Sequence, residues 1–160
     1  MSTVPAPDGP AVLCWDGSEA AAEAIRDSAR LLGDGQPAIV LFAYVPTERA
    51  RGVLGGVSGP DAPIMAAVEA EELLDRGVAM ARDAGLDATG ELVVAEAKTA
   101  GIIAELAEER NARLIAMGQR RRSALGRLVL GSVTRELLGD FHRPVLVVGP
   151  GSPGAHPRGA

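Results

Sequence analysis

A chain of 160 residues is long enough for one domain with a sizeable core but not for two. Apolar residues make up 47% of the sequence and aromatic residues only 2%, so the core must be mainly aliphatic. No apolar run is long enough to span a membrane, and the first residues lack the pattern of a secretory signal. The single cysteine, Cys14, excludes an intramolecular disulfide. We therefore expect a cytoplasmic protein with neither a membrane nor a nucleic-acid partner.

The net charge of −5 conceals an uneven distribution along the chain. Residues 1–109 hold 7 Lys and Arg against 19 Asp and Glu, whereas residues 110–143 hold 8 Arg against 2 acidic residues. Two interpretations of the basic segment are open. It can attract an anionic ligand, or its arginines can form surface salt bridges.

The chain begins with a leader and a strand–turn–helix unit. Residues 1–10 contain three prolines and are expected to form a flexible leader. The continuous apolar run at 11–15 predicts a strand that is covered on both faces. Asp16-Gly17-Ser18 predicts a turn followed by a helix N-cap. Apolar positions at helical spacing predict a helix over 18–32, which Gly33 ends.

The middle of the chain predicts a second strand, a long loop and a second helix. The apolar run at 38–45 is again typical of a buried strand. Residues 46–63 are rich in glycine and proline, and a loop of this length is uncommon unless it is disordered or covers a site. We favour a mobile lid. An amphipathic pattern predicts a helix over 64–84, which Gly85 ends.

The last part of the chain continues the alternation of strands and helices. Pro144 lacks an N–H group, so the strand that it begins suits the edge of a sheet. The glycines and prolines of 149–160 show no periodicity and predict a disordered tail. The predicted elements are a third strand at 92–95, a helix from 102 to about 111, a fourth strand at 112–117, a helix over 133–138 and a fifth strand at 144–148.

Five strands alternating with four helices over 11–148 predict a single doubly wound α/β domain, with a parallel sheet and helices on both faces. Ligands of such sheets bind beyond the carboxyl ends of the strands, where the strand order reverses. Asp16 ends the first strand and Gly118 ends the fourth. Asp16 can accept hydrogen bonds from ribose hydroxyls, or it can simply form the turn.

The segment from Met117 to Val133 carries the strongest functional signal. Gly118 follows a buried strand, and Gly131-Ser132 precedes a helix, whose first N–H groups have no internal partner and favour anions. Gly131 allows close approach of a ligand, Ser132 can cap the helix or donate to a phosphate, and Val133 adds a further N–H. A strand-end turn at Gly118 and an ordinary helix cap are the alternatives.

This segment resembles the universal stress proteins. Their nucleotide-binding members carry Gly, two residues, Gly, nine residues and then Gly-Ser or Gly-Thr. Gly118 and Gly131-Ser132 match this pattern, whereas Arg121 replaces the middle glycine. The resemblance implies a five-stranded sheet of order 3-2-1-4-5, with a crevice between the first and fourth strands.

By the same resemblance, the ligand is ATP or a related adenine nucleotide, bound by Asp16, by backbone near Val45 for the adenine, and by the glycine loop for the phosphates. A role for Mg is left open. Arg121 can fill the phosphate groove, at a backbone cost of roughly 1–2 kcal/mol if the position needs positive φ. Alternatively, it turns outward and donates a charge-assisted hydrogen bond to phosphate.

Catalysis is poorly supported by the sequence. His142 and His156 lie outside any plausible reacting centre, and neither a Walker lysine nor a metal-ligand cluster is present. We therefore expect a stress-response module that signals by its conformation. A dimeric interaction protein without nucleotide and a slow ATPase are the alternatives. The resemblance also implies a homodimer through the fifth strand, whose apolar residues would otherwise leave an open sheet edge. They are Val145, Leu146, Val147 and Val148.

Overall fold

The structure is a computed structural model that describes residues 7–50, 62–119 and 131–149. Several sequence predictions lie outside these residues. They are the first part of the leader, the centre of the 46–63 loop, Arg121 with its neighbouring arginines, and all of the tail but Gly149.

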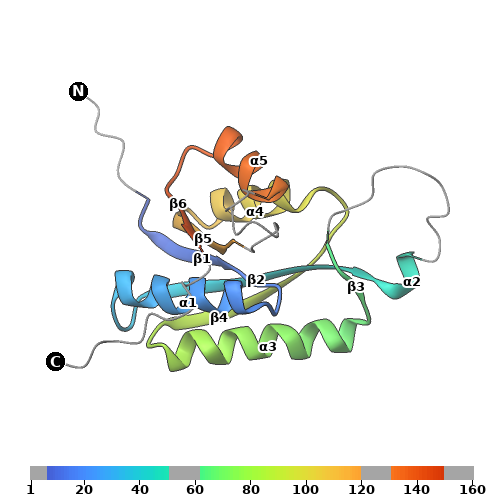
Figure 1. Cartoon of the computed structure of the whole chain (residues 1–160), viewed down its shortest axis with the longest axis horizontal. Helices are drawn as coiled ribbons and strands as arrows, with labels where there is room; N and C mark the ends of the chain where they lie inside the picture. Colours follow the sequence, from blue (N-terminus) through green and yellow to red (C-terminus); the bar gives the residue numbers. More distant parts are fainter. Residues whose placement is uncertain (1–6, 51–61, 120–130, 150–160) are drawn as a thin grey trace, which may run out of the picture.

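The described residues form one parallel sheet with helices on both faces (Figure 1). The five longer strands have the order β4-β2-β1-β5-β6, which confirms the expected doubly wound arrangement. In chain order the elements are β1 (Gly9–Cys14), α1 (Glu19–Leu32), β2 (Pro37–Pro46), α2 (Thr47–Ala50), β3 (Ile64–Met65), α3 (Ala67–Asp83), β4 (Asp87–Val94), α4 (Thr99–Glu109), β5 (Ala112–Gly118), α5 (Ser132–Asp140) and β6 (Val145–Val148).

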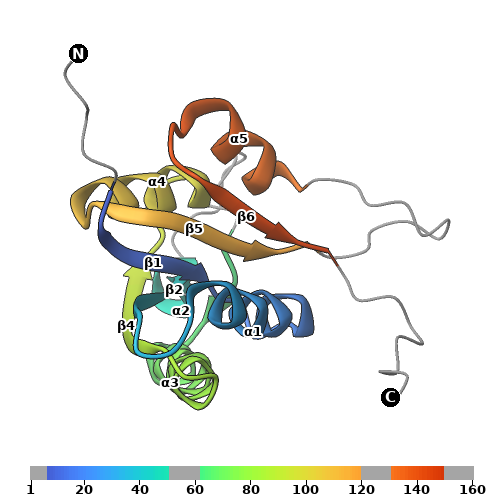
Figure 2. The same cartoon turned by 90° about the vertical axis from the view of Figure 1, so that its left-hand side faces the viewer.

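Alternation along the central strands divides the aliphatic core into two layers. Leu13 of β1 is in register with Val40 of β2 and Ala116 of β5, and all three pack towards α1 and α3. The neighbouring residues Val12 and Ile115 face the opposite way, towards α4 and α5. Figure 2 shows these two helix pairs on either side of the sheet. Because both faces are covered, the central strands β1 and β2 are almost entirely apolar rather than alternating.

The structure adds a sixth, two-residue strand where the sequence predicted the start of a helix. Ile64 and Met65 form β3, which pairs with the end of β2, and α3 begins only at Ala67. β2 extends beyond the end of β1, so its last backbone groups need another partner. Val45 N–H donates to Pro63 O at 2.8 Å and so meets this need. The prediction of a helix from residue 64 was therefore wrong in its first turn.

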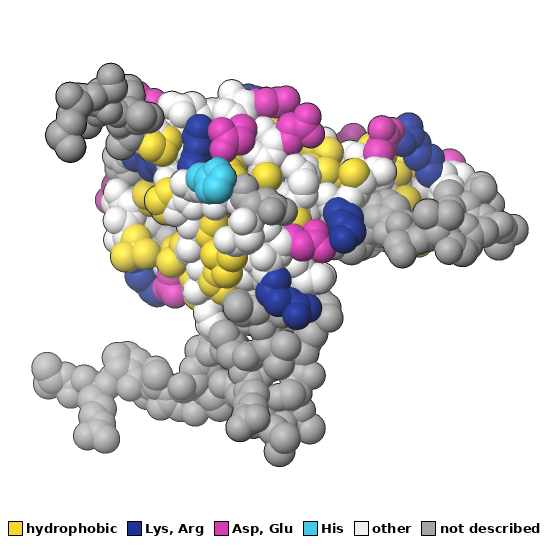
Figure 3. Space-filling view, turned by 90° about the horizontal axis from the view of Figure 1, so that it is seen from above, with side chains coloured by type: hydrophobic (Ala, Val, Ile, Leu, Met, Phe, Trp, Pro, Cys, Tyr) yellow, Lys and Arg dark blue, Asp and Glu magenta, His cyan; other side chains and the backbone are white. Residues whose placement is uncertain are grey.

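Three of the described arginines of the basic segment lie near the amino-terminal ends of the strands, away from their carboxyl ends. Arg113 donates to the carbonyls of Asp8 and Gly9, and Arg143 donates to the carbonyl of Ala112, where β5 begins. Arg110 pairs with Glu91 at 3.1 Å. The face over α4 and α5 mixes acidic and basic side chains (Figure 3). For these three arginines, structural bonding is therefore the better interpretation.

Candidate functional site

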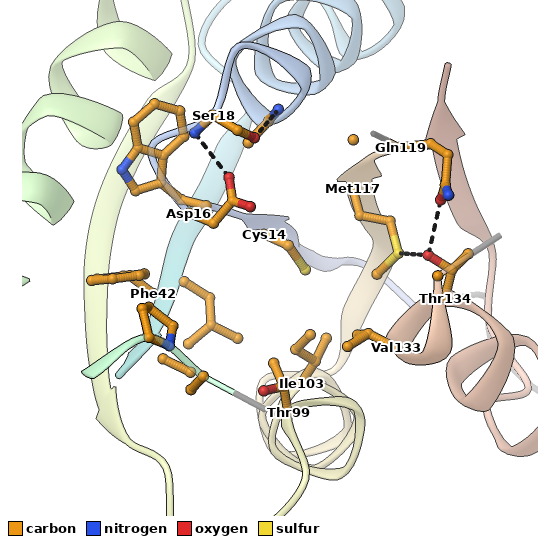
Figure 4. Close-up of a pocket in the computed structure, with 18 of the residues that line it drawn as sticks. Cys14, Asp16, Ser18, Phe42, Thr99, Ile103, Met117, Gln119, Val133 and Thr134 are labelled. Atoms are coloured by element: carbon orange, nitrogen blue, oxygen red, sulfur yellow. Dashed lines mark hydrogen bonds between the residues drawn. The ribbon is translucent and has the colours of Figure 1, made fainter. Parts of the chain in front are cut away.

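A cavity of about 370 Å³ opens at the carboxyl ends of β1 and β5, beside the middle of β2. This is the point at which β1 has neighbours on both sides and the chain connections leave towards opposite faces, as expected for a ligand site in a doubly wound sheet. Figure 4 shows its walls converging from several elements. The lining residues are Cys14, Trp15, Asp16, Ser18, Ala21, Leu41, Phe42, Ala43, Ala62, Pro63, Thr99, Ile103, Met117, Gly118, Gln119, Gly131, Ser132, Val133 and Thr134.

Asp16 lies on the rim of the cavity and also shapes the turn that follows β1. One carboxylate oxygen, Oδ1, accepts the N–H of Ser18 at 2.9 Å. Ser18 in turn caps α1, because its hydroxyl accepts the N–H of Ala21 at 3.2 Å. The turn interpretation of Asp16 is therefore confirmed. Its exposed side chain lines the cavity, where contact with ribose hydroxyls stays a prediction.

Gly118 is required by the packing of β5 against α1. A Cβ atom at this position would lie 2.1 Å from the carbonyl oxygen of Ala20 and 2.7 Å from the nitrogen of Ala21. Both are backbone atoms of the first turn of α1, so no side-chain rotation could relieve the overlap. The glycine therefore allows the start of α1 to lie directly against the end of β5, and so keeps Asp16 close to the β5 side of the cavity.

The amino-terminal end of α5 forms the opposite wall. Gly131 is the N-cap residue, with φ of −63° and ψ of 164°, and no described side chain caps this helix. The predicted capping role of Ser132 is thus absent, because Ser132 is already the first helical residue. A Cβ atom at Gly131 would meet open space. The first turn of α5 consequently presents backbone donors next to the cavity, an arrangement that attracts anions.

Buried polar contacts join the end of β5 to α5. The hydroxyl of Thr134 lies 3.2 Å from Met117 Sδ and 3.4 Å from Gln119 Oε1 (Figure 4). Thr134 and Gln119 are both buried, and the backbone N–H of Gln119 donates to Val148 O at 2.8 Å. These contacts connect α5 to β5 and β6. The neighbouring strands therefore fix the position of the cavity wall that α5 forms.

Cys14 lies on the floor of the cavity with its sulfur pointing inwards (Figure 4). Burial raises the pKa of the Cys14 thiol from 9.0 to about 12, and the nearby Asp16 carboxylate adds to the increase. The thiol is therefore protonated at neutral pH, and a protonated thiol is a poor nucleophile. The geometry gives Cys14 a packing role at the floor of the cavity.

Five of the seven site residues expected from the sequence line this cavity: Asp16, Gly118, Gly131, Ser132 and Val133. Val45 does not line it, and its N–H is engaged by Pro63 O. Arg121 lies outside the described residues.

Sequence reasoning missed several lining residues, among them residues of β2 and of α4. Leu41, Phe42 and Ala43 are consecutive residues of β2 and all line the cavity, so strand periodicity alone does not single them out. Thr99 and Ile103 lie at the start of α4, and only the strand order places them beside α5. Among the described lining residues, Asp16 is the only one with a formal charge.

The strand order, the cavity at the reversal point and the glycine-flanked helix start define a doubly wound α/β protein with a candidate anion-binding site. Comparison with known sequences then places this protein more narrowly. The model of the universal stress protein family matches residues 10–149. The chain belongs to the universal stress protein family.

Individual relatives agree with this assignment. A universal stress protein of Methanocaldococcus jannaschii, MJ0531, is 38% identical over 80 residues, which are 50% of this chain and 46% of that protein. The match thus spans about half the length of that relative. A universal stress protein structure from Archaeoglobus fulgidus is 28% identical with a TM-score of 0.65, covering 88% of this chain and 98% of the other.

A further structure of the universal stress protein from Archaeoglobus fulgidus is described as a complex with dAMP. It is 24% identical, with a TM-score of 0.58, and the match covers 88% of this chain and 97% of that chain. At this identity the likeness supports the fold. In the described part of this chain, no helix has the length and apolar character needed to cross a bilayer.

Proposed function

We propose that this protein binds ATP or a related adenine nucleotide in the cavity between β1 and α5, and that it acts in stress response through its conformation rather than through fast catalysis. One observation carries the proposal: Asp16 and the uncapped start of α5, far apart in the sequence, line the same cavity. A carboxylate that accepts ribose hydroxyls beside a helix N-terminus that binds phosphate suits a nucleotide.

The proposed ligand lies across the cavity with its ribose at Asp16 and its phosphates at α5. The N–H groups of the first turn of α5 and the hydroxyl of Ser132 act as phosphate donors. The base lies on the apolar wall between Leu41 and Ile103. Val45 could contact the adenine through its N–H only after losing the hydrogen bond to Pro63. The dAMP in the Archaeoglobus fulgidus protein supports an adenine ligand in this family.

Titration calorimetry with ATP and AMP, together with thermal shift measurements, tests the proposal. We expect measurable binding by the wild-type protein and a weaker affinity for Asp16→Asn, because the amide accepts hydrogen bonds less strongly than the carboxylate. Glu71→Gln, on the exposed face of α3, is the matched charge control and should leave binding unchanged. If millimolar nucleotide produces no heat of binding and no thermal shift, the proposal is rejected.

The replacement of a family glycine by Arg121 favours one rival function, a dimeric stress-related interaction protein that binds no nucleotide. In that case Arg121→Gly creates or strengthens ATP binding, whereas Gly131→Val changes nothing in the parent protein. If the parent binds nucleotide, Gly131→Val instead weakens it, because the new side chain enters open space beside the start of α5.

We further propose a cytoplasmic location and a homodimer formed through β6. The edge position of β6 and its four apolar residues support the dimer. Slow ATP hydrolysis with water as nucleophile is compatible with the same site. Product formation that Asp16→Ala abolishes would support such an activity. If the protein shows no turnover above the buffer background, the activity is excluded.

A further inference from the structure

Trp15 connects the rim of the cavity to the middle of α3. It is the only tryptophan of the chain, it is 7% exposed, and it lines the cavity directly before Asp16. Its indole Nε1–H donates to the carbonyl of Leu73 at 2.7 Å. Within α3 that carbonyl is also the acceptor for the helical N–H four residues later. The indole therefore donates to the second lone pair of the Leu73 carbonyl oxygen. The hydrogen bond is added to an intact helix and does not replace a missing helical one.

The surface of α3 is shaped to receive this indole. A Cβ atom at Gly77 would lie 2.9 Å from Cγ, Cδ1 and Nε1 of Trp15, so the five-membered ring lies over bare backbone. Leu73 and Gly77 are four residues apart and thus share one face of α3. The hydrogen bond and the contact surface come from neighbouring turns, and together they fix both the position and the plane of the ring.

The same face of α3 also contacts the chain on the other side of Asp16. Gly17 has φ of +78°, and a Cβ atom there would lie 2.8 Å from Cδ1 of Leu73. The backbone N–H of Trp15 donates to Leu41 O at 2.9 Å, which extends the pairing of β1 with β2 by one residue. Asp16 is exposed, yet the residues before and after it are both held against α3 or β2.

We propose that Trp15 is a positioning residue for the ribose-binding carboxylate, and that α3 holds Asp16 in its ligand-binding position through Trp15. This inference rests on the proposed nucleotide function of the cavity. The contacts of Trp15 with Leu73 and Gly77 restrict the conformations of Asp16 before the ligand binds. Less conformational entropy is therefore lost on binding. A ligand bound at Asp16 is then connected through Trp15 to α3, which lies on the face of the sheet opposite α5.

A double-mutant cycle tests whether Trp15 acts through Asp16. AMP is titrated by calorimetry into the wild-type protein, Trp15→Phe, Asp16→Asn and the double variant. Losing the indole hydrogen bond should weaken AMP binding by about three- to tenfold when Asp16 is present. In the Asp16→Asn background the same change should alter affinity by less than about twofold, because there is no carboxylate left to position. Equal losses in both backgrounds would overturn the inference.

A second ligand and a second variant separate positioning from general loosening. Dideoxy-AMP, which lacks both ribose hydroxyls, should bind Trp15→Phe and wild type equally. Gly77→Ala displaces the same ring from the α3 side and should weaken AMP but not dideoxy-AMP. Val78→Ala is the matched control: it destabilises the same core and lies next to Gly77, yet AMP affinity should be unchanged. A loss of AMP affinity in Val78→Ala as large as that in Gly77→Ala would contradict positioning.

The outcomes distinguish this inference from the proposed function. If the wild-type protein binds neither AMP nor ATP, the proposed function fails and the inference fails with it. If the wild type binds AMP and Trp15→Phe binds it equally well, the nucleotide site stands and Trp15 has only a packing role. Circular dichroism and thermal unfolding of every variant establish that the compared proteins are folded at the titration temperature.

Discussion

At the scale of single residues, the cavity combines groups that serve the fold and the site at once. Asp16 shapes a turn and lines the rim, and Cys14 closes the floor. Gly118 illustrates how the two roles are connected. The family pattern marks it as a ligand-binding glycine, whereas in the structure a Cβ atom at this position would lie only 2.1 Å from the carbonyl oxygen of Ala20.

Gly118→Ala should therefore lower the free energy of unfolding by about 1–3 kcal/mol, as expected for an overpacked contact that only a backbone shift can relieve. Chemical denaturation of the protein without ligand measures this. Gly101→Ala is the matched control: position 101 lies in α4 with open space around it, so alanine should stabilise the helix by about 1 kcal/mol or less. Equal stability of Gly118→Ala and wild type would contradict the packing role.

Cys14 should react slowly with thiol reagents in the folded protein. Its pKa of about 12 leaves little thiolate between pH 7 and pH 9, so alkylation by iodoacetamide should be much slower than in the unfolded chain. Because the thiol ionises at a higher pH in the folded than in the unfolded chain, the free energy of unfolding should fall as pH rises from 9.0 towards about 12.

The measurements for Cys14 are an alkylation rate and an unfolding free energy as functions of pH. Cys14→Ala should unfold with a smaller loss of stability between pH 9 and the highest accessible pH than the wild type. If the cavity holds a nucleotide, saturating AMP should slow the alkylation further, because Cys14 lies on the cavity floor. A thiol that reacts as fast as in denatured protein at pH 8 would contradict the raised pKa of Cys14.

At the scale of elements, the amphipathic helix α1 contains one internal conflict. The hydroxyl of Ser28 is buried, with 0% of the residue exposed, and has no hydrogen-bond partner among the described residues. Such an unpaired hydroxyl costs stability. Serine is also a weaker helix former than alanine.

Ser28→Ala should raise the free energy of unfolding by about 1 kcal/mol, because it removes a buried polar group that nothing satisfies. Ser18→Ala provides a comparison of opposite sign in the same helix. It removes the N-cap hydrogen bond to Ala21 and should cost about 1 kcal/mol. Denaturant titration of both variants measures the effects. A destabilised Ser28→Ala protein would mean that its hydroxyl has a partner or that its volume matters more than its polarity.

Periodicity and turn chemistry predicted most elements because they act locally. The turn at Asp16-Gly17 and the cap at Ser18 lie within a few residues, and the structure has both. The strand predicted at 11–15 is β1 at Gly9–Cys14, so the prediction of a flexible leader over 1–10 was wrong at residues 9 and 10, which pair with the sheet. β3 could not be predicted, because two residues carry no period and their pairing with β2 depends on how far β2 extends past β1. The hydrogen bond of Trp15 could not be predicted for the same reason, because its partner Leu73 is distant in sequence.

The residues of the candidate site also divide into those that local sequence signals predict and those that only tertiary packing brings to the cavity. Asp16 and Gly131 follow local signals and were predicted, whereas Thr99 and Ile103 enter the cavity only because α4 packs beside α5. The contact at Val45 was implied by the family resemblance rather than by a local signal, and in the structure its N–H is engaged by Pro63 O.

At the scale of the whole molecule, the two edges of the sheet differ in character. β4 carries Asp87 and Glu91 along one edge, and charged residues discourage pairing with another strand. The other edge, β6, holds four apolar residues, all half-buried. Ile115 N–H and Gln119 N–H donate to the carbonyls of Pro144 and Val148. Because alternate residues point to opposite sides, the N–H of Val147 points away from β5.

The proposed dimer should therefore depend on the outward N–H of Val147. Val147→Pro removes this donor while leaving the hydrogen bonds to β5 intact, and an edge strand tolerates proline. We expect the wild-type protein to sediment as a dimer at micromolar concentration, and Val147→Pro to sediment as a folded monomer. Val147→Thr is the matched control, because it keeps the N–H and the β-branched shape. A wild-type monomer, or a Val147→Pro dimer as tight as the parent, would show that β6 does not pair with a second copy.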